Sequence, residues 1–287
     1  MRSLLASDDV LDRLEPLGTP GLHTRLAKFV VETGSGPRRY AVKRYAWPLL
    51  AALRTWGHGT RARTEFAALE ALEPLVPVPV RAAAWGERRA LGFALRSVLV
   101  TELLEDAVDL KAWRLSFARG DRPRAERTQL LRALPELARL LRRIHDAGFF
   151  AANAFQKNVL WRPEAPAAES FSLVDLPFAR CTGRPLSRRR RVYDLACLDK
   201  DASMVLTASD RLRFFLAYEG RALEAGDRGV LARVASERVR REHATFLSGI
   251  ERSVKKSLKR TSLGKLLTGR DPEERRRGPR GGAGSLA

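Results

Sequence analysis

The chain has 287 residues, of which 45% are apolar and 30% charged, a balance typical of folded soluble proteins and unlike that of disordered chains. No apolar run approaches the roughly 20 residues that a membrane-spanning helix needs, and the first residues turn acidic too early for a secretory signal. Two cysteines, Cys181 and Cys197, fit neither a disulfide framework nor a zinc site, so we expect a cytoplasmic protein.

The formal net charge of +20 favours an anionic partner without naming it. Arginines outnumber lysines 44 to 9, which a compositional bias explains as well as selection for anion binding does. Residues 252–287 hold 11 basic and 3 acidic residues, a net charge of +8, which leaves +12 on the rest of the chain. The sequence shows no aromatic stacking motif of the kind that binds single strands, so nucleic acid is the last-ranked partner.

The first third of the chain is rich in predicted strands. Residues 22–32 and 39–45 have strand-like composition, and the turn residues 33–37 between them predict a β-hairpin. Residues 47–59 form an irregular insertion. From residue 61 to about residue 73, apolar positions recur at helical spacing and predict a helix. The prolines that follow exclude a helix at first, and residues 98–100 are a strand candidate.

After residue 105 the pattern becomes helical. A stripe of apolar residues predicts a long helix that stops at Gly148; its members are Leu130, Leu131, Leu134, Leu137, Leu141 and Ile144. Two short strands are expected at 159–161 and 171–174. Helices are expected at 192–203 and at 208–223, the second with Ser209 as its N-cap.

The C-terminal part is predicted to hold one more helix and then no regular structure. That helix would bury Val239, His243, Phe246, Leu247 and Ile250 on one face, and the chain beyond residue 270 is expected to be disordered. The whole order predicts an α+β fold of two lobes. Residues 1–104 would form a small β-rich lobe, residues 105–251 a larger, mainly helical lobe, and residues 252–287 a basic flexible tail.

This order is that of a two-lobed kinase, whose chemistry needs a cation on the phosphates, oxygen ligands for magnesium, and a group that orients the attacking hydroxyl. Lys43 lies in the middle of a predicted strand, where its ammonium group could reach phosphate oxygens; an exposed strand lysine is the alternative. Glu65, on the following helix, could pair with Lys43. Glu70 and Glu73 are rival partners, and a solvated helix face is the alternative for all three.

Two further residues have the chemistry of magnesium ligands. Asp175 directly follows an apolar strand, and Asn158 directly precedes the strand at 159–161. A turn aspartate is the alternative for Asp175. Each signal alone is weak, but the order and spacing of Lys43, Glu65, Asn158 and Asp175 together favour a kinase.

At these residues the chain resembles the lipopolysaccharide kinase family, the Kdo and heptose kinases with a protein-kinase-like fold. The resemblance covers about residues 20–220 and rests on short motifs, of which the segment LTASDRLRFFLAYEG is the most specific to the family. The others include YAVKRY, RARTEFAALEAL, SVLVTELLE, LLRRIHDAGFF, NVLW with FSLVDL, and RRRRVYDLACL.

The resemblance implies a kinase that uses ATP and Mg²⁺ and phosphorylates a sugar hydroxyl on a lipid-linked acceptor. It implies that the nucleotide lies at a hinge near Glu102 to Leu104. It also makes Asp194 the buried helix aspartate that holds the backbone of the catalytic loop, for which an ordinary helix N-terminal aspartate is the alternative.

The catalytic loop departs from the family at its most important position. The family reads like H-R-D-L-x-x-x-N there, and this chain has Ala151, Ala152 and Asn153 in the first three places. An asparagine can orient a hydroxyl but cannot take its proton, and a general base is typically worth about 10²–10⁴ in rate. The first hairpin also has only Gly18 and Gly21 where a glycine-rich loop is usual, a milder departure.

Three functions therefore stay open. The first is a kinase weakened by Asn153, and the second is a pseudokinase that keeps a nucleotide-binding or scaffold role. The third is a basic nucleic-acid-binding protein. For the first, the basic residues of the 252–287 tail would attach the protein to anionic lipid at the inner face of a membrane, at roughly 1 kcal/mol per basic residue; a solvated tail is the alternative.

Overall fold

The computed structural model describes residues 14–17, 24–34, 36–46, 59–222, 224 and 226–241. The chain divides into two compact units, residues 1–238 and 239–287. Several predicted features lie outside the described residues: the insertion at 47–59 (apart from Gly59), Gly18 and Gly21, the last helix beyond residue 241, and the 252–287 tail. Within the described residues, no helix combines the length and apolarity that crossing a membrane requires.

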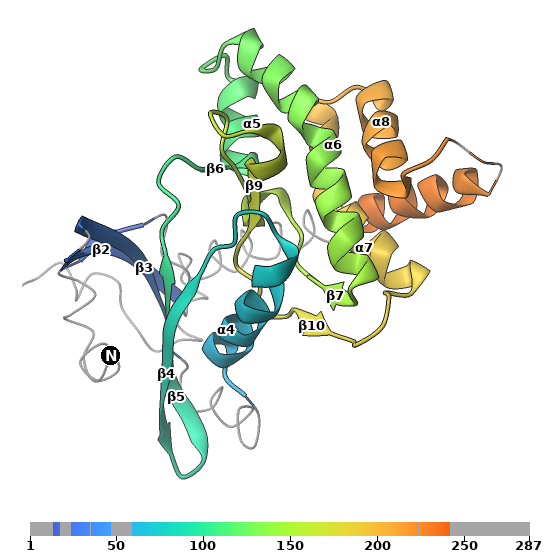
Figure 1. Cartoon of the computed structure of the whole chain (residues 1–287). Coiled ribbons are helices and arrows are strands. Elements are labelled where there is room, and N and C mark those ends of the chain that lie inside the picture. The colour runs from blue at the N-terminus through green and yellow to red at the C-terminus, as the bar shows by residue number, and fades with distance from the viewer. Residues whose placement is uncertain are drawn as a thin grey trace, which may run out of the picture. The chain divides into compact units, whose positions relative to one another are not determined.

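An antiparallel sheet forms the N-terminal part, as predicted (Figure 1). Its strand order is β1-β2-β3-β5-β4. The bounds are β1 Glu15–Pro16, β2 Thr24–Thr33, β3 Gly36–Ala46, β4 Ala82–Ala90 and β5 Phe93–Glu102. Strands β2 and β3 pair along their whole length and form the predicted hairpin. Gly36 has a φ of +107°, which a residue with a side chain rarely adopts, and this explains a glycine in the turn.

Strand β4 was not predicted. The predicted strand at 98–100 lies within β5. The sequence of β4, AAAWGERRA, is made mostly of alanine and charged residues and has little of the β-branched composition that marks a strand. It lies at the edge of the described sheet and pairs with β5 through its backbone, with irregularities between Ala82 and Ala84 and between Arg88 and Arg89. Pairing to a strong neighbour therefore compensates for a weak intrinsic preference.

Helix α4 (Arg61–Leu72) follows the prediction closely. The side chain of Thr60 caps it by accepting a hydrogen bond from the backbone N–H of Arg63 at 3.3 Å. One face of α4 is buried, and Glu65 lies on that face among alanines and leucines. A carboxylate is rarely buried unless it is paired, so this glutamate needs a partner.

The rest of the described chain is mainly helical, with small antiparallel ladders between the helices (Figure 1). The helices are α5 (Leu110–Ala118), α6 (Arg124–Asp146), α7 (Arg188–Asp199) and α8 (Ala208–Glu219), and a further helical stretch covers 227–238. The short strands are β6 (Val108–Asp109), β7 (Phe149–Phe150), β8 (Val159–Trp161), β9 (Phe171–Leu173) and β10 (Arg180–Cys181). The predicted strands at 159–161 and 171–174 are thus β8 and β9, which pair with each other.

Helix α6 carries the predicted stripe and ends where the sequence indicates. Most of the stripe is buried in the core, which also takes in Tyr45 and Leu99 of the sheet, so one core joins sheet and helices. Gly148 has a φ of +81°, and a Cβ there would lie 2.4 Å from the carbonyl oxygen of Arg184. Both the backbone angle and this close approach require glycine.

Helix α8 begins at residue 208 as expected, but its predicted N-cap was wrong. Thr207, not Ser209, is the N-cap: its hydroxyl accepts from the backbone N–H of Asp210, and the Asp210 carboxylate accepts from the backbone N–H of Thr207. This reciprocal pair is a capping box, which requires a hydroxyl residue three positions before the acid. Helix α7 also begins and ends four residues earlier than predicted.

Candidate active site

Lys43 and Glu65 form an ion pair between strand β3 and helix α4. The Nζ atom of Lys43 lies 3.0 Å from Oε2 and 3.3 Å from Oε1 of Glu65, and only 3% of the glutamate side chain is exposed. The hydroxyl of Tyr45 donates a second hydrogen bond to Oε2 at 2.6 Å. Of the rival partners, Glu73 pairs with Arg81 instead, at 3.3 Å, and Glu70 is exposed. Glu65 is therefore the partner, and Lys43 is not an exposed strand lysine.

Tyr45 has a supporting part in this pair. Burial and the neighbouring Glu65 carboxylate raise the pKa of Tyr45 well above its ordinary value. The phenol therefore keeps its proton and remains a hydrogen-bond donor to Glu65. Two donors, Tyr45 and Lys43, thus satisfy the buried carboxylate of Glu65, which holds the ammonium group of Lys43 in place.

Asp175, which lies two residues after strand β9, also contacts Lys43. Its Oδ1 contacts Nζ of Lys43, and its Oδ2 lies 3.6 Å from Nζ of Lys157. Burial acts to raise the pKa of Asp175, but the charges of Lys43 and Lys157 outweigh it and hold the pKa below its ordinary value. Asp175 also has a φ of +55°, an unusual backbone angle for a residue with a side chain and one that often marks a functional position.

The loop at 151–158 is tied to Asp175 by its two asparagines. The Nδ2 atom of Asn153 donates to the backbone carbonyl of Asp175 at 3.2 Å, and Nδ2 of Asn158 donates to the backbone carbonyl of Asn153 at 2.7 Å. The backbone carbonyl of Asn158 accepts from the N–H of Val174 at 2.9 Å. One connected cluster therefore joins residues up to 132 positions apart in the sequence: Lys43, Glu65, Asn153, Asn158 and Asp175.

Asp194 lies beneath this loop and is completely buried. Its Oδ2 accepts a hydrogen bond from the backbone N–H of Ala151 at 3.0 Å, and Nε2 of His145 lies 3.4 Å from the same oxygen. Burial raises the pKa of Asp194, and the neighbouring His145 and the hydrogen bonds from the loop backbone oppose that rise. Nδ1 of His145 in turn lies 2.8 Å from the hydroxyl of Tyr218 on α8.

Asp194, His145 and Tyr218 follow one another as buried polar side chains. Of these, His145 and Tyr218 were not predicted. A signal for His145 was present, because it is an ionisable residue four positions after Leu141 and next to Ile144 in the apolar stripe of α6. No pattern in the sequence links Tyr218 to His145, since they are 73 residues apart.

Glu102 and Leu104, the predicted hinge residues, lie at and just beyond the end of β5. The backbone N–H of Glu102 donates to the carbonyl of Arg81 at 2.8 Å, and that of Leu103 donates to the carbonyl of Arg39 at 3.0 Å. The side chain of Glu102 lies 3.4 Å from Arg38. Leu104 packs against the main core. The segment thus connects the sheet to the helical part.

The donor set fits magnesium held together with a nucleotide. Nδ2 of Asn158 is engaged with the backbone, so the oxygen is the atom of that amide that a metal would use, and Asp175 supplies an ionised carboxylate. No group of three or more His, Cys, Asp or Glu side chains suited to a metal occurs among the described residues. Magnesium is commonly held by one or two carboxylates together with substrate phosphates, so two protein ligands are compatible with it.

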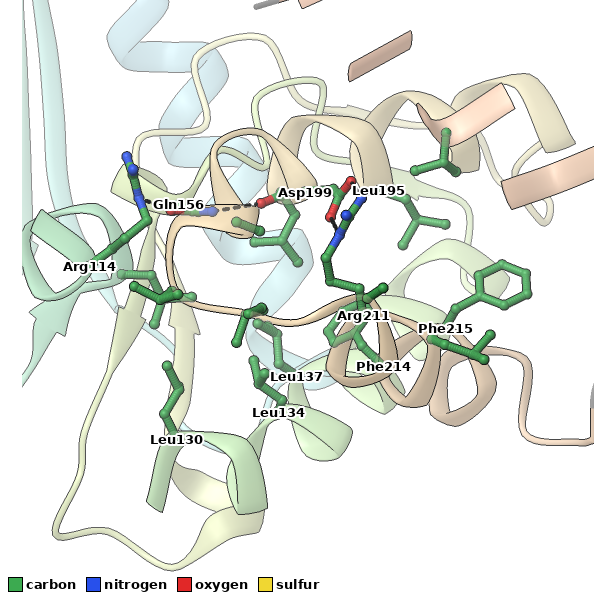
Figure 2. A pocket seen from close by; sticks show the side chains of 18 of the residues that line it. Arg114, Leu130, Leu134, Leu137, Gln156, Leu195, Asp199, Arg211, Phe214 and Phe215 are labelled. Atoms are coloured by element: carbon green, nitrogen blue, oxygen red, sulfur yellow. Dashed lines mark hydrogen bonds and ion pairs between the residues drawn. The ribbon is translucent and has the colours of Figure 1, made fainter. Parts of the chain in front are cut away.

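A separate cavity of about 420 Å³ opens between the helices (Figure 2). Leucines and phenylalanines from α6, α7 and α8 form most of its wall, among them Leu134, Leu137 and Phe215. Polar groups lie along part of the wall: Nε of Arg114 donates to Gln156 at 2.8 Å, and Arg211 forms a two-fold ion pair with Asp199. The wall of the cavity is therefore mainly apolar and includes a few charged and amide side chains.

Comparisons with known proteins agree with this fold. Residues 24–218 match the lipopolysaccharide kinase (Kdo/WaaP) family. The chain is 30% identical over 203 residues to the lipopolysaccharide core heptose(I) kinase WaaP of Pseudomonas aeruginosa, and the match covers 69% of each chain. A solved structure of WaaP in complex with acyl carrier protein resembles it with a TM-score of 0.57 and 26% identity, over 81% of this chain and 91% of that one.

Proposed function

The chain belongs to the lipopolysaccharide kinase (Kdo/WaaP) family, and from that membership we propose that it transfers the γ-phosphoryl group of ATP to a sugar hydroxyl of a lipid-linked acceptor. The observation that carries this proposal is the contact of Lys43 with both Glu65 and Asp175. A lysine fixed by one buried carboxylate and facing a second, metal-binding one is the arrangement that positions phosphates in kinases.

Each residue of the cluster has a proposed part in the reaction. Lys43 holds phosphate oxygens, and Glu65, with Tyr45, keeps Lys43 in place. Asp175 and Asn158 hold Mg²⁺, which when bound neutralises charge on the phosphates. The adenine would lie beside the link from Glu102 to Leu104. Asp194 holds the loop backbone, which keeps Asn153 and Asn158 at fixed positions relative to Asp175.

Asn153 stands where a base would act and limits the rate. Its amide can accept a hydrogen bond from the acceptor hydroxyl and orient it, but it cannot take the proton. Because phosphoryl transfer depends mostly on positioning and charge neutralisation, transfer without a base is slowed rather than prevented. The alternative is a pseudokinase that binds nucleotide and does not turn over.

An anionic acceptor suits the segment between Asp175 and Asp194. Residues 176–193 contain six arginines and no acidic residue. Arg180 pairs with Phe150 across the ladder of β10 and β7, and the guanidinium of Arg190 lies 5.6 Å from the ring centre of the same Phe150. Phe150 comes directly before the loop that carries Asn153. These arginines support an acceptor that carries carboxylate or phosphate groups.

The test is phosphoryl transfer itself. The full chain, given Mg²⁺, ATP labelled in its γ-phosphate and lipopolysaccharide that lacks core phosphate, should label the lipopolysaccharide. Lys43→Met should reduce the label by about a hundredfold or more, because it removes the cation from the phosphates. Lys28→Met is the matched control, since Lys28 is on the neighbouring strand and pairs with Glu15 at 2.8 Å. Label that persists in the Lys43 variant would contradict the proposed role, and nucleotide binding without any label would favour the pseudokinase.

We also propose an acyl carrier protein as a partner, because the structurally similar WaaP was solved in complex with one. Acyl carrier proteins present a fatty acyl chain, and the cavity among α6, α7 and α8 has the apolar wall that such a chain needs. The polar groups of its wall, Arg114, Gln156, Asp199 and Arg211, would lie near the polar end of the acyl chain.

Blocking the cavity should separate binding of the acyl chain from binding of its carrier. Ala208 lines the cavity and is exposed, so Ala208→Trp should narrow the opening without disturbing the core. Native mass spectrometry should show a complex of the wild type with acylated carrier, and the variant should bind it at least about tenfold more weakly. Ser209→Trp, exposed and outside the cavity, should bind as the wild type does. Equal binding of acylated and unacylated carrier would count against the cavity as the acyl site.

A further inference from the structure

Lys157 lies on the loop at 151–158, next to Asn158. It is four residues after Asn153 and directly before Asn158, in the short 3₁₀ turn Gln156–Asn158. Its Nζ lies 3.6 Å from Oδ2 of Asp175, and 52% of its side chain is exposed. Lysine is scarce in this chain, with 9 lysines against 44 arginines, so a lysine beside the candidate metal ligand is a distinctive feature.

The two lysines that meet Asp175 differ in what else holds them. Lys43 also binds Glu65 at 3.0 Å, so it has a partner whether or not Asp175 is available. In the described part of the chain, Asp175 is the only carboxylate that pairs with Lys157. If Asp175 bound Mg²⁺, Lys43 would therefore keep its position through Glu65, whereas the ammonium group of Lys157 would lose its counter-charge.

The charge balance of the loop points the same way. The loop at 151–158 contains no acidic residue, since Asn153 stands where the family has an aspartate. No residue of the loop therefore balances the positive charge of Lys157. A nucleotide phosphate held with Mg²⁺ beside Asp175 would then be the anion nearest to the ammonium group of Lys157.

We propose that Lys157 binds the terminal phosphate of the nucleotide, in addition to Lys43. This inference rests on the proposed function. In the transfer, the acceptor oxygen bonds to the γ-phosphorus, the bond to the bridging oxygen of ADP breaks, and ADP leaves with that electron pair. The hydroxyl proton passes to solvent, because Asn153 cannot hold it. Lys157 stabilises the negative charge of the transferring phosphoryl group and so offsets part of the loss of the base.

Selectivity between ATP and ADP tests this assignment without relying on turnover. Calorimetry on the full chain would compare the Mg²⁺ complexes of β,γ-imido-ATP and of ADP, which differ in the terminal phosphate. Lys157→Met should weaken binding of the ATP analogue by about tenfold or more and leave ADP binding unchanged, because a charge-assisted contact to one phosphate is lost. Lys157→Arg should restore most of the selectivity.

Lys111→Met is the matched control, because Lys111 is an exposed lysine of α5 and takes no part in the cluster. It should bind both nucleotides as the wild type does. The inference is wrong if Lys157→Met binds the ATP analogue as tightly as the wild type, or if it loses affinity for both nucleotides equally. Either result would leave the proposed function intact. If the wild type binds neither nucleotide, the proposed function fails and this inference fails with it.

Discussion

Replacing Asn153 by aspartate should raise the rate of phosphoryl transfer by about 10²–10⁴-fold, the range a positioned general base usually contributes. The new carboxylate would remove the proton of the acceptor hydroxyl, whereas the amide of Asn153 can only accept a hydrogen bond from that hydroxyl. The site is prepared for it, because the loop backbone is fixed by Asp194 and by Asn158. The variant loses the hydrogen bond from Nδ2 to the carbonyl of Asp175, a smaller effect than gaining a base.

Single-turnover measurements with a lipid-linked sugar acceptor would check this expectation. Asn153→Ala is the control, since it removes both the amide and any base and should be slower than the wild type. A rate for Asn153→Asp no higher than that of the wild type would mean that position 153 does not face the acceptor. A large gain from an inert wild type would identify a pseudokinase, and measurable turnover by the wild type itself would exclude one.

The fold could be predicted in large part because its main signals are local. The paired strands β2 and β3 are joined by turn residues, and the apolar stripe of α6 ends at a glycine whose backbone angle requires one. Strand β4 escaped prediction because it is held by pairing to β5 rather than by its own composition. The N-cap of α8 was misplaced by two residues because both Thr207 and Ser209 can cap a helix, and only the partner Asp210 decides between them.

The candidate site was predicted from the order of its residues rather than from any one of them. Lys43, Glu65, Asn158 and Asp175 each had an ordinary alternative, and the structure now joins them in one cluster through Lys43 and the 151–158 loop. The contacts of His145 with Tyr218 and of Lys157 with Asp175 could not be foreseen, because they depend on how the helices and loops meet. The chemical roles of all these residues remain predictions.

Removing the carboxylate of Asp175 should abolish nucleotide binding that depends on Mg²⁺. Asp175 is the ionised carboxylate of the cluster that faces both lysines, and its pKa below the ordinary value keeps it charged at neutral pH. Asp175→Ala would leave Asn158 as the remaining protein ligand, and one amide oxygen holds Mg²⁺ poorly. Lys43 would keep Glu65 as its partner, so the fold around it should survive.

Asp201→Ala is a matched control, since Asp201 is likewise an aspartate with a positive φ, of 61°, but lies outside the cluster and pairs with Arg114 at 3.4 Å. It should bind nucleotide as the wild type does. Thermal unfolding of both variants would show whether either has lost its fold.

We expect Lys43, Glu65, Asn158 and Asp175 together to hold a nucleotide with magnesium, and calorimetric titration of ATP tests this directly. The titration would be run on the wild type and on Asp175→Ala, each with Mg²⁺ and with the metal removed by a chelator. We predict binding by the wild type with Mg²⁺, at least about tenfold weaker binding without it, and no metal dependence in the variant. Equal binding by both proteins under both conditions, or no binding by the folded wild type, would contradict the account.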